Sequence, residues 1–313
     1  MKVLSSKANI LAALSLAIFA TPTGVSAKPN RPAKEQSQPA FKQMNHISVQ
    51  VLGSKGSPVI LIPGLSSPRA AWDGVAPNLA KTHRVYLVQI NGFGGDDPRS
   101  NLKPGILNGV LADINALILE RKLKDVAVVG HSMGGLVGLM LAARHPENLS
   151  RLMVVDSLPF FAVQMAPPGT KLTVAMVEPQ ASKMRDAVVA SYGKPADPAA
   201  VDAQVGGMTL KPEHRAQLKS WAVASDPRVA GQVLYENLTT DMRSELGTIQ
   251  VPVTVVYAWN EKFPRRDRAD VFFRSEYAGI KQATFSGVGP SAHFVMLDQP
   301  ETFVSDLEKF LAK

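Results

Sequence analysis

VAVVGHSMGG, residues 126–135, joins a short apolar run to a serine flanked by glycines. The run 126–129 has the β-branched composition of a buried strand, and the segment after Ser132 has the composition of a helix. A serine between a strand and a helix lies on a sharp, strained turn, where glycines at Gly130 and Gly134 let the two elements approach each other. This setting predicts a nucleophilic serine at Ser132. The alternative is a glycine-rich turn that serves packing alone.

A backbone donor is expected directly after this serine. Met133 would begin the helix, and the first N–H groups of a helix have no partner within the helix itself. The N–H of Met133 is therefore expected to face the negative oxygen that develops when a serine attacks a carbonyl carbon. The same stretch would supply both a nucleophile and one donor of an oxyanion hole.

Apolar runs similar to the one before Ser132 recur along the chain, with helical patterns between them. Continuous valine and isoleucine runs that alternate with helices predict a mostly parallel sheet with both faces covered. Seven strands are expected, at residues 47–52, 59–62, 85–90, 126–129, 152–155, 251–257 and 283–286. Helices are expected at residues 70–81, 107–121, 133–144, 267–277 and 301–311. Residues 158–247 contain no strand-like run, which predicts an inserted helical cap.

Three segments of the chain resemble the α/β-hydrolase superfamily: LIPGL at 61–65, GHSMGG at 130–135 and AHFVMLDQPE at 292–301. They are similar to its branch of small esterases, C–C hydrolases and haloperoxidase-like enzymes. The resemblance implies an α/β-hydrolase fold with a mostly parallel central sheet flanked by helices. It places the core at residues 46–157 and 248–313 and the helical cap at residues 158–247. Such motifs identify a superfamily and leave the substrate open.

The resemblance also implies a second oxyanion donor in the loop after the strand at 59–62. Relatives have His-Gly in this loop, whereas this chain has Pro63-Gly64-Leu65. The donor would be the backbone N–H of Leu65, so the missing histidine does not remove it, and Gly64 would permit close approach of a substrate. A Pro-Gly pair is also an ordinary turn, and both interpretations stay open.

A serine hydroxyl needs a base whose pKa lies near neutrality, which makes histidine the expected partner. Of the six histidines, only His293 falls in a loop between the last strand and the terminal helix, where the α/β-hydrolase fold presents its base. His131 adjoins Ser132, but neighbours on a sharp turn point apart, so a packing or pocket role is expected for it. The other four are expected to be surface or packing residues: His46, His83, His145 and His214.

The third member of a triad holds the histidine in the right tautomer and stabilises its cation. In most relatives this acid follows the penultimate strand, where this chain has Asn260-Glu261 in place of an Asp. A less common arrangement, similar to that of pancreatic-type lipases, places an Asp directly after the strand before the cap. That residue is Asp156. Asp156 is preferred because Asp is the commoner residue in this role, and Glu261 is the alternative. Asp267 and Asp270 are weaker candidates.

The first 27 residues have the three-part plan of a secretory signal. Two lysines precede an apolar run at residues 10–20, and small residues stand at Val25 and Ala27. The run is shorter than the roughly 20 apolar residues that a membrane-spanning helix needs. We therefore expect cleavage after Ala27, export to the periplasm or the exterior, and no integral membrane span. Residues 28–45 are expected to form a flexible tether outside the fold.

The chain is basic, with 34 Lys and Arg against 26 Asp and Glu and a formal net charge of +8. The first 45 residues hold six of the basic side chains and one of the acidic ones, a net charge of +5. Most of the basic excess therefore lies outside the predicted fold, and it does not predict a nucleic-acid partner.

Cofactor and metal chemistry are not expected. The chain has no cysteine, which excludes disulfides, thiolate nucleophiles and zinc–thiolate sites. No His-x-x-x-His pattern or carboxylate cluster has the spacing of metal ligands, and a serine mechanism needs no cofactor.

These observations together predict an exported serine hydrolase that acts on a small ester, lactone or related acyl compound. Ser132 would form the acyl-enzyme, with His293 as the base. One alternative is a C–C bond hydrolase or a cofactor-free peroxidase-like relative, and another is a non-catalytic binding module on the same fold. The sequence leaves the natural substrate and the oligomeric state open.

Overall fold

The computed structural model describes residues 41–167, 169–262 and 264–312. Its centre is an eight-stranded sheet in the order β1-β2-β4-β3-β5-β6-β7-β8. The β1–β2 and β2–β4 pairs are antiparallel, and all the other pairs are parallel. The strands are β1 (Phe41–Gln43), β2 (Ile47–Leu52), β3 (Pro58–Ile62), β4 (Arg84–Ile90), β5 (Ala127–His131), β6 (Arg151–Val155), β7 (Val253–Ala258) and β8 (Ala283–Val288).

Helices connect the strands. The α-helices are α1 (Ala76–Leu79), α2 (Ile106–Glu120), α3 (Met133–Arg144), α4 (Val174–Val189), α5 (Pro198–Val205), α6 (Pro212–Val223), α7 (Pro227–Thr239), α8 (Arg266–Glu276), α9 (Val295–Asp298) and α10 (Pro300–Leu311). Short 3₁₀ turns are η1 (Arg69–Trp72), η2 (Arg99–Leu102), η3 (Pro146–Asn148), η4 (Phe161–Met165) and η5 (Leu246–Thr248).

Both faces of the sheet are buried, each under its own hydrophobic core. Side chains alternate along a strand, so neighbouring residues of one strand belong to different cores. In β3, Ile60 and Ile62 belong to the core that includes α2, α3 and α8. Their neighbours Val59 and Leu61 belong to the second core, which includes η1, α1 and α10. This arrangement explains why the strands appear in the sequence as continuous apolar runs, and it confirms the predicted fold class.

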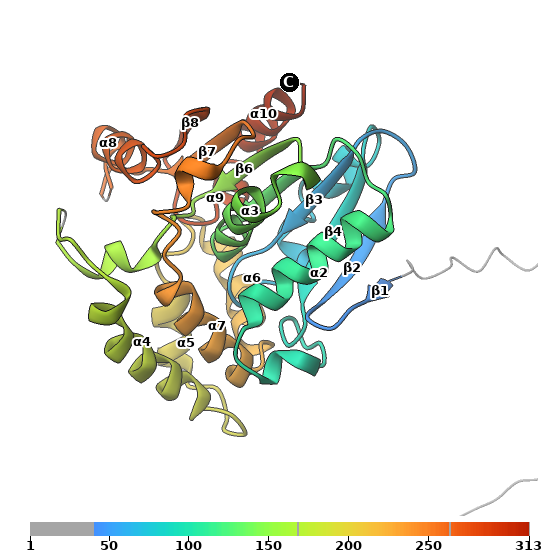
Figure 1. Ribbon diagram of the computed structural model, residues 1–313. Helices are drawn as coiled ribbons and strands as arrows, with labels where there is room; N and C mark the ends of the chain where they lie inside the picture. Colours follow the sequence, from blue (N-terminus) through green and yellow to red (C-terminus); the bar gives the residue numbers. More distant parts are fainter. Residues whose placement is uncertain (1–40, 168, 263, 313) are drawn as a thin grey trace, which may run out of the picture. The chain divides into compact units, whose positions relative to one another are not determined.

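Four helices, α4 to α7, lie between β6 and β7 and form a layer beside the sheet (Figure 1). The side chain of Glu236 on α7 accepts hydrogen bonds from the N–H groups of Gly105, Ile106 and Leu107, at 2.7, 3.1 and 2.8 Å. These are unpaired donors at the start of α2, where a carboxylate is favoured by the helix dipole. The cap segment is therefore bound to a core helix through a carboxylate.

The start of the fold differs from the prediction. Residues 28–45 were expected to be a tether, but Phe41–Gln43 pair with β2 as an eighth strand. Three side-chain contacts hold this strand: Lys42 pairs with Glu120, the guanidinium of Arg69 lies over the Phe41 ring, and the Gln43 amide bonds to Asn91. The leader predicted at 1–27 and the tether residues 28–40 lie outside the described residues.

A second difference concerns the helix expected at residues 70–81. The structure has two short pieces there, η1 and α1. Pro77 lies in the first turn of α1, where a proline lacks the N–H that a continuing helix would use and clashes with the preceding turn. The proline therefore divides the segment.

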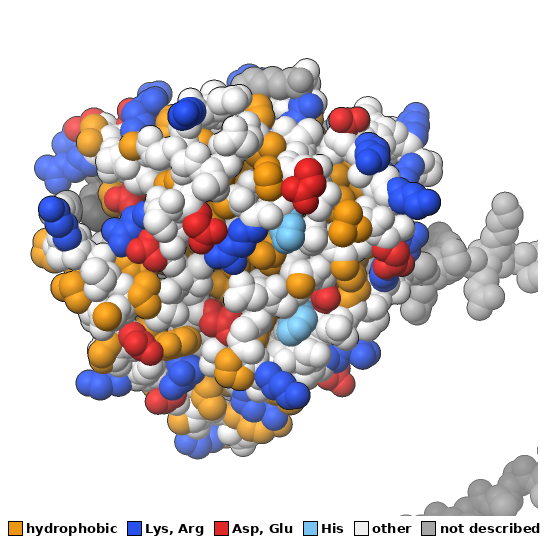
Figure 2. Space-filling view, in the orientation of Figure 1, with side chains coloured by type: hydrophobic (Ala, Val, Ile, Leu, Met, Phe, Trp, Pro, Cys, Tyr) orange, Lys and Arg blue, Asp and Glu red, His pale blue; other side chains and the backbone are white. Residues whose placement is uncertain are grey.

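Basic and acidic side chains are interspersed on the face of the protein that Figure 2 shows. Among the described residues, no helix combines the length and the apolar character needed to cross a membrane.

Candidate active site

Ser132 lies between β5 and α3 with φ 53° and ψ −124°, a conformation that a residue with a side chain rarely adopts. Its N–H donates to the carbonyl of Val155 at 2.9 Å, which fixes the turn to β6. The turn requires glycine on both sides. A Cβ on Gly130 would lie 2.2 Å from the carbonyl oxygen of Gly134, and a Cβ on Gly134 would lie 2.4 Å from that of Ile62. The predicted strand–turn–helix setting of Ser132 is therefore present.

Asp156 and His293 meet beside this turn. Nδ1 of His293 lies 2.6 Å from Oδ2 of Asp156, and the N–H of Ala258 donates to Oδ1 of the same carboxylate at 3.0 Å. Asp156 follows β6 with φ 45°, in the left-handed region that Asp tolerates better than most residues. Because a carboxylate accepts, the Nδ1 atom of His293 is the donor, which leaves Nε2 on the side of the ring away from Asp156.

Ser132 itself is buried, with 8% of its surface exposed. Its hydroxyl makes no hydrogen bond with any residue that the structure describes, His293 included. Contacts between a nucleophile and its base are often long in proteins without bound substrate. The structure thus places the three residues on neighbouring loops, with the hydrogen bond between His293 and Asp156 formed.

The two expected backbone donors lie next to Ser132. A Cβ on Gly64 would lie 3.1 Å from Cβ of Ser132, so the loop after β3 packs directly against the turn of Ser132. The N–H of Leu65 in that loop and the N–H of Met133 at the start of α3 make no hydrogen bond within the described part of the chain. Both donors are therefore available for a negatively charged oxygen near Ser132.

His131 has a closer relation to the site than the sequence indicated. It is fully buried, and its Nε2 donates to the carbonyl of His293 at 3.0 Å. Its ring centroid lies 4.6 Å from those of both His293 and Phe294. Burial, together with the nearby His293, lowers the pKa of His131 well below its ordinary value. His131 is therefore a neutral imidazole with its proton on Nε2.

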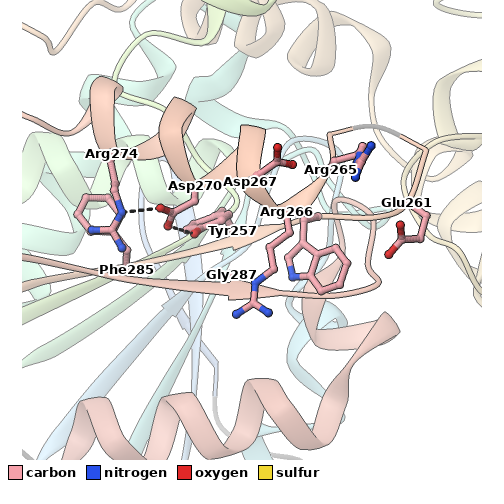
Figure 3. Close-up of a pocket in the computed structure, with 10 residues that line it drawn as sticks. Tyr257, Glu261, Arg265, Arg266, Asp267, Asp270, Arg274, Phe285 and Gly287 are labelled. Atoms are coloured by element: carbon pink, nitrogen blue, oxygen red, sulfur yellow. Dashed lines mark hydrogen bonds and ion pairs between the residues drawn. The ribbon is translucent and has the colours of Figure 1, made fainter.

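Glu261, the alternative acid, is exposed and lies in a separate groove with a volume of about 670 Å³ (Figure 3). Asp267 and Asp270 lie in the same groove, on α8. Asp270 accepts from Arg274 at 2.8 Å and from the hydroxyl of Tyr257 at 2.5 Å, and these contacts, chiefly the one with Arg274, lower its pKa. The residues that line this groove do not include Ser132, Asp156 or His293: they are Tyr257, Trp259, Glu261, Arg265, Arg266, Asp267, Asp270, Arg274, Phe285 and Gly287.

The structure therefore brings five of the predicted site residues together and separates the sixth from them. The five are Ser132, His293, Asp156, Leu65 and Met133, and the sixth is Glu261. Among the described residues, no group of three or more His, Cys, Asp or Glu side chains is arranged to hold a metal ion.

Comparison with known proteins agrees with this architecture. Residues 57–300 match the sequence profile of the family described as alpha/beta hydrolase fold, which confirms the resemblance seen in the sequence. The chain is 29% identical over 216 residues to the pimeloyl-(acyl-carrier protein) methyl ester esterase of Edwardsiella ictaluri, covering 66% of this chain and 77% of that protein.

Two solved structures have the same fold. An esterase from Exiguobacterium antarcticum superposes with a TM-score of 0.71 and 20% identity, over 88% of this chain and 100% of that one. The enol-lactonase from Burkholderia xenovorans superposes with a TM-score of 0.69 and 18% identity, with the same coverage of the two chains.

Proposed function

This chain belongs to the α/β-hydrolase fold family, and on that premise we propose that it is a serine hydrolase of small carboxylic esters, lactones or related acyl compounds. One observation carries the proposal: the Asp156–His293 hydrogen bond of 2.6 Å lies beside the strained turn of Ser132. The relative from Edwardsiella ictaluri, which is named as a methyl ester esterase, supports an ester as the substrate class.

The first half of the proposed reaction forms an acyl-enzyme. The hydroxyl oxygen of Ser132 attacks the substrate carbonyl carbon while its proton passes to Nε2 of His293. The carbonyl oxygen becomes negative and accepts hydrogen bonds from the N–H groups of Leu65 and Met133. When the tetrahedral intermediate collapses, the bond to the alcohol oxygen breaks, and His293 returns its proton to that oxygen. The acyl group stays on Ser132.

The second half regenerates the enzyme. A water molecule gives a proton to His293 and attacks the acyl carbon, and the same two N–H groups stabilise the new oxyanion. Collapse releases the carboxylic acid and returns the proton to Ser132. In both halves His293 becomes a cation for a short time, and Asp156 stabilises that cation. The N–H of Ala258 holds the other oxygen of Asp156, which fixes the orientation of the carboxylate.

We extend the proposal to export. The basic start, the apolar run at 10–20 and the small residues Val25 and Ala27 support a cleaved leader. Mass spectrometry of the protein recovered from a bacterial host should find Lys28 as the first residue, in the periplasmic or extracellular fraction. An intact Met1 on protein in the cytoplasmic fraction would contradict export without affecting the proposed chemistry.

Covalent labelling tests the enzymatic proposal directly. A fluorophosphonate probe should label the wild-type protein, and the protein should hydrolyse p-nitrophenyl esters. Ser132→Ala should abolish both. Ser150→Ala is the matched control. Ser150 lies just before β6, away from the turn of Ser132, and its hydroxyl donates to the carbonyl of Val126. Wild-type protein that is folded but takes no label at Ser132 would overturn the proposal.

A further inference from the structure

Asp298 is a buried carboxylate outside the proposed triad, with 2% of its surface exposed. Its Oδ2 accepts from the N–H of Ala292 at 2.7 Å and from the N–H of Leu210 at 3.0 Å. Its Oδ1 accepts from the hydroxyl of Thr209 at 2.5 Å. Ala292 directly precedes His293, whereas Thr209 and Leu210 belong to the cap, between α5 and α6. The carboxylate thus joins the loop of the proposed base to the cap.

A second contact joins the same two segments on the other side of His293. The N–H of Phe294 donates to the carbonyl of Met208 at 2.9 Å. We call residues 208–210 the cap strap. The chain on both sides of His293 is therefore hydrogen-bonded, directly or through Asp298, to the cap strap.

Apolar packing reinforces these hydrogen bonds. The ring centroids of Trp221, on α6, and Phe294 lie 6.1 Å apart. Val205 of α5 and Leu218 of α6 are buried in the same core cluster as Phe294. The α5–α6 half of the cap is therefore packed together with the loop of the base and does not merely lie above it.

Because Asp298 is buried, its carboxylate depends on the hydrogen bonds that join the two segments. A carboxylate removed from water is strongly destabilising unless hydrogen-bond donors replace the lost hydration. Hydrogen bonds to a charged acceptor are also about twice as strong as those between neutral groups. Because the donors come from two segments, the carboxylate keeps all its hydrogen bonds only when the cap strap and the loop of His293 hold their observed positions relative to each other.

We propose that Asp298 and Thr209 are positioning residues for His293. Through them the cap strap fixes the loop whose imidazole is hydrogen-bonded to Asp156. The part of this inference that concerns turnover depends on the proposed hydrolase function, whereas the part that concerns the order of the loop does not.

The test uses hydrogen exchange and kinetics on the same variants. Thr209→Val removes the hydroxyl donor and keeps the shape of the side chain, whereas Thr209→Ser restores the hydroxyl. In Thr209→Val, amide exchange across residues 289–298 should accelerate about tenfold, and kcat for a p-nitrophenyl ester should fall about tenfold with little change in KM. Thr209→Ser should be close to the wild-type protein in both measurements.

Asp298→Asn should lower kcat further, and the double variant with Thr209→Val should lose less than the product of the two single losses, because both act on one network. Asp226→Asn is the matched control. Asp226 is a cap carboxylate whose side chain accepts from Arg228 within its own segment. This variant should leave exchange at residues 289–298 unchanged.

Two results would overturn the proposal: unchanged loop exchange in folded Thr209→Val, or loss of kcat that Thr209→Ser does not restore. If Asp298→Asn fails to fold, the two Thr209 variants still decide. If the wild-type protein hydrolyses no ester, the proposed function fails, and the exchange measurement alone still decides whether the cap strap orders the loop.

Discussion

His131 and His293 are joined by a partly buried hydrogen bond of 3.0 Å from the Nε2 of the first to the backbone carbonyl of the second. The residue before the proposed nucleophile therefore holds the main chain of the residue proposed as its base. The other ring nitrogen of His131 is buried and has no hydrogen-bond partner among the residues that the structure describes. It lies against Gly64, since a Cβ there would be 3.0 Å away. One neutral side chain thus contacts both the loop of the base and the loop that contains Leu65.

This burial makes stability depend on pH. The lowered pKa of His131 means that the unfolded chain takes up a proton at higher pH than the native protein does. The contribution of neutral His131 to stability is therefore complete above its unfolded pKa of about 6.5, and it is lost below that at up to about 1.4 kcal/mol per pH unit. Urea unfolding of wild type and His131→Gln at pH 7.5, 6.5 and 5.5 should show the advantage of the wild type shrinking as pH falls. If the free energies of unfolding of the two proteins differ by the same amount at all three pH values, this prediction is contradicted.

The two carboxylates considered for the triad should differ sharply on substitution. Asp156→Asn removes the charge that stabilises the His293 cation and should lower kcat by about 10⁴, as in serine proteases. Glu261→Gln changes an exposed side chain in a separate groove and should leave kcat within about twofold. Steady-state hydrolysis of a p-nitrophenyl ester measures both. Similar, mild losses in the two variants would mean that neither residue is the acid.

Gly134 should not tolerate a larger residue. A Cβ there would lie 2.4 Å from the carbonyl oxygen of Ile62, the last residue of β3, and 2.7 Å from that of Pro63, the first residue of the following loop. Gly134→Ala should destabilise the protein by about 3 kcal/mol, since the turn of Ser132 would have to move. Gly74→Ala is the control, because a Cβ at Gly74 meets nothing within 4 Å. Thermal unfolding followed by circular dichroism compares the two, and equal melting temperatures would refute the clash.

Glu236 should contribute to the stability of the whole fold through its bonds to the start of α2. Glu236→Gln retains a hydrogen-bond acceptor but removes the charge that complements the helix dipole, and it should cost about 1 kcal/mol. Glu308→Gln, on the exposed side of α10, should cost less than about 0.5 kcal/mol. The difference should persist in 0.5 M salt, because Glu236 contacts its donors directly. Urea unfolding of both variants at two salt concentrations checks this.

The sequence was sufficient for the features that are local in the chain. Apolar runs located the strands of the sheet, and the glycines around Ser132 located the turn, because both depend on neighbouring residues. It favoured Asp156 as the acid but left Glu261 open, since the acid is decided by which of the two loops lies beside His293 in the folded chain. The contact of His131 with His293 and the hydrogen bonds of Asp298 to the cap could not be predicted either, because they also join residues that are distant in the sequence. The strand at Phe41–Gln43 was missed because its few residues are held by side chains distant in sequence.

The attachment of α4 differs from that of the rest of the cap. α4 packs chiefly on α7, and its Met176 side chain is exposed, whereas Glu236 and the cap strap are bound to the core. Mutational drift on the exposed face of α4, away from the buried Val177 and Ala181, would thus cost little folding free energy, while changes at the bound positions would be selected against. A directed-evolution library that aims at new ester preferences should vary the exposed positions of α4. A chimaera that exchanges the whole cap should keep residues 208–210 and Glu236.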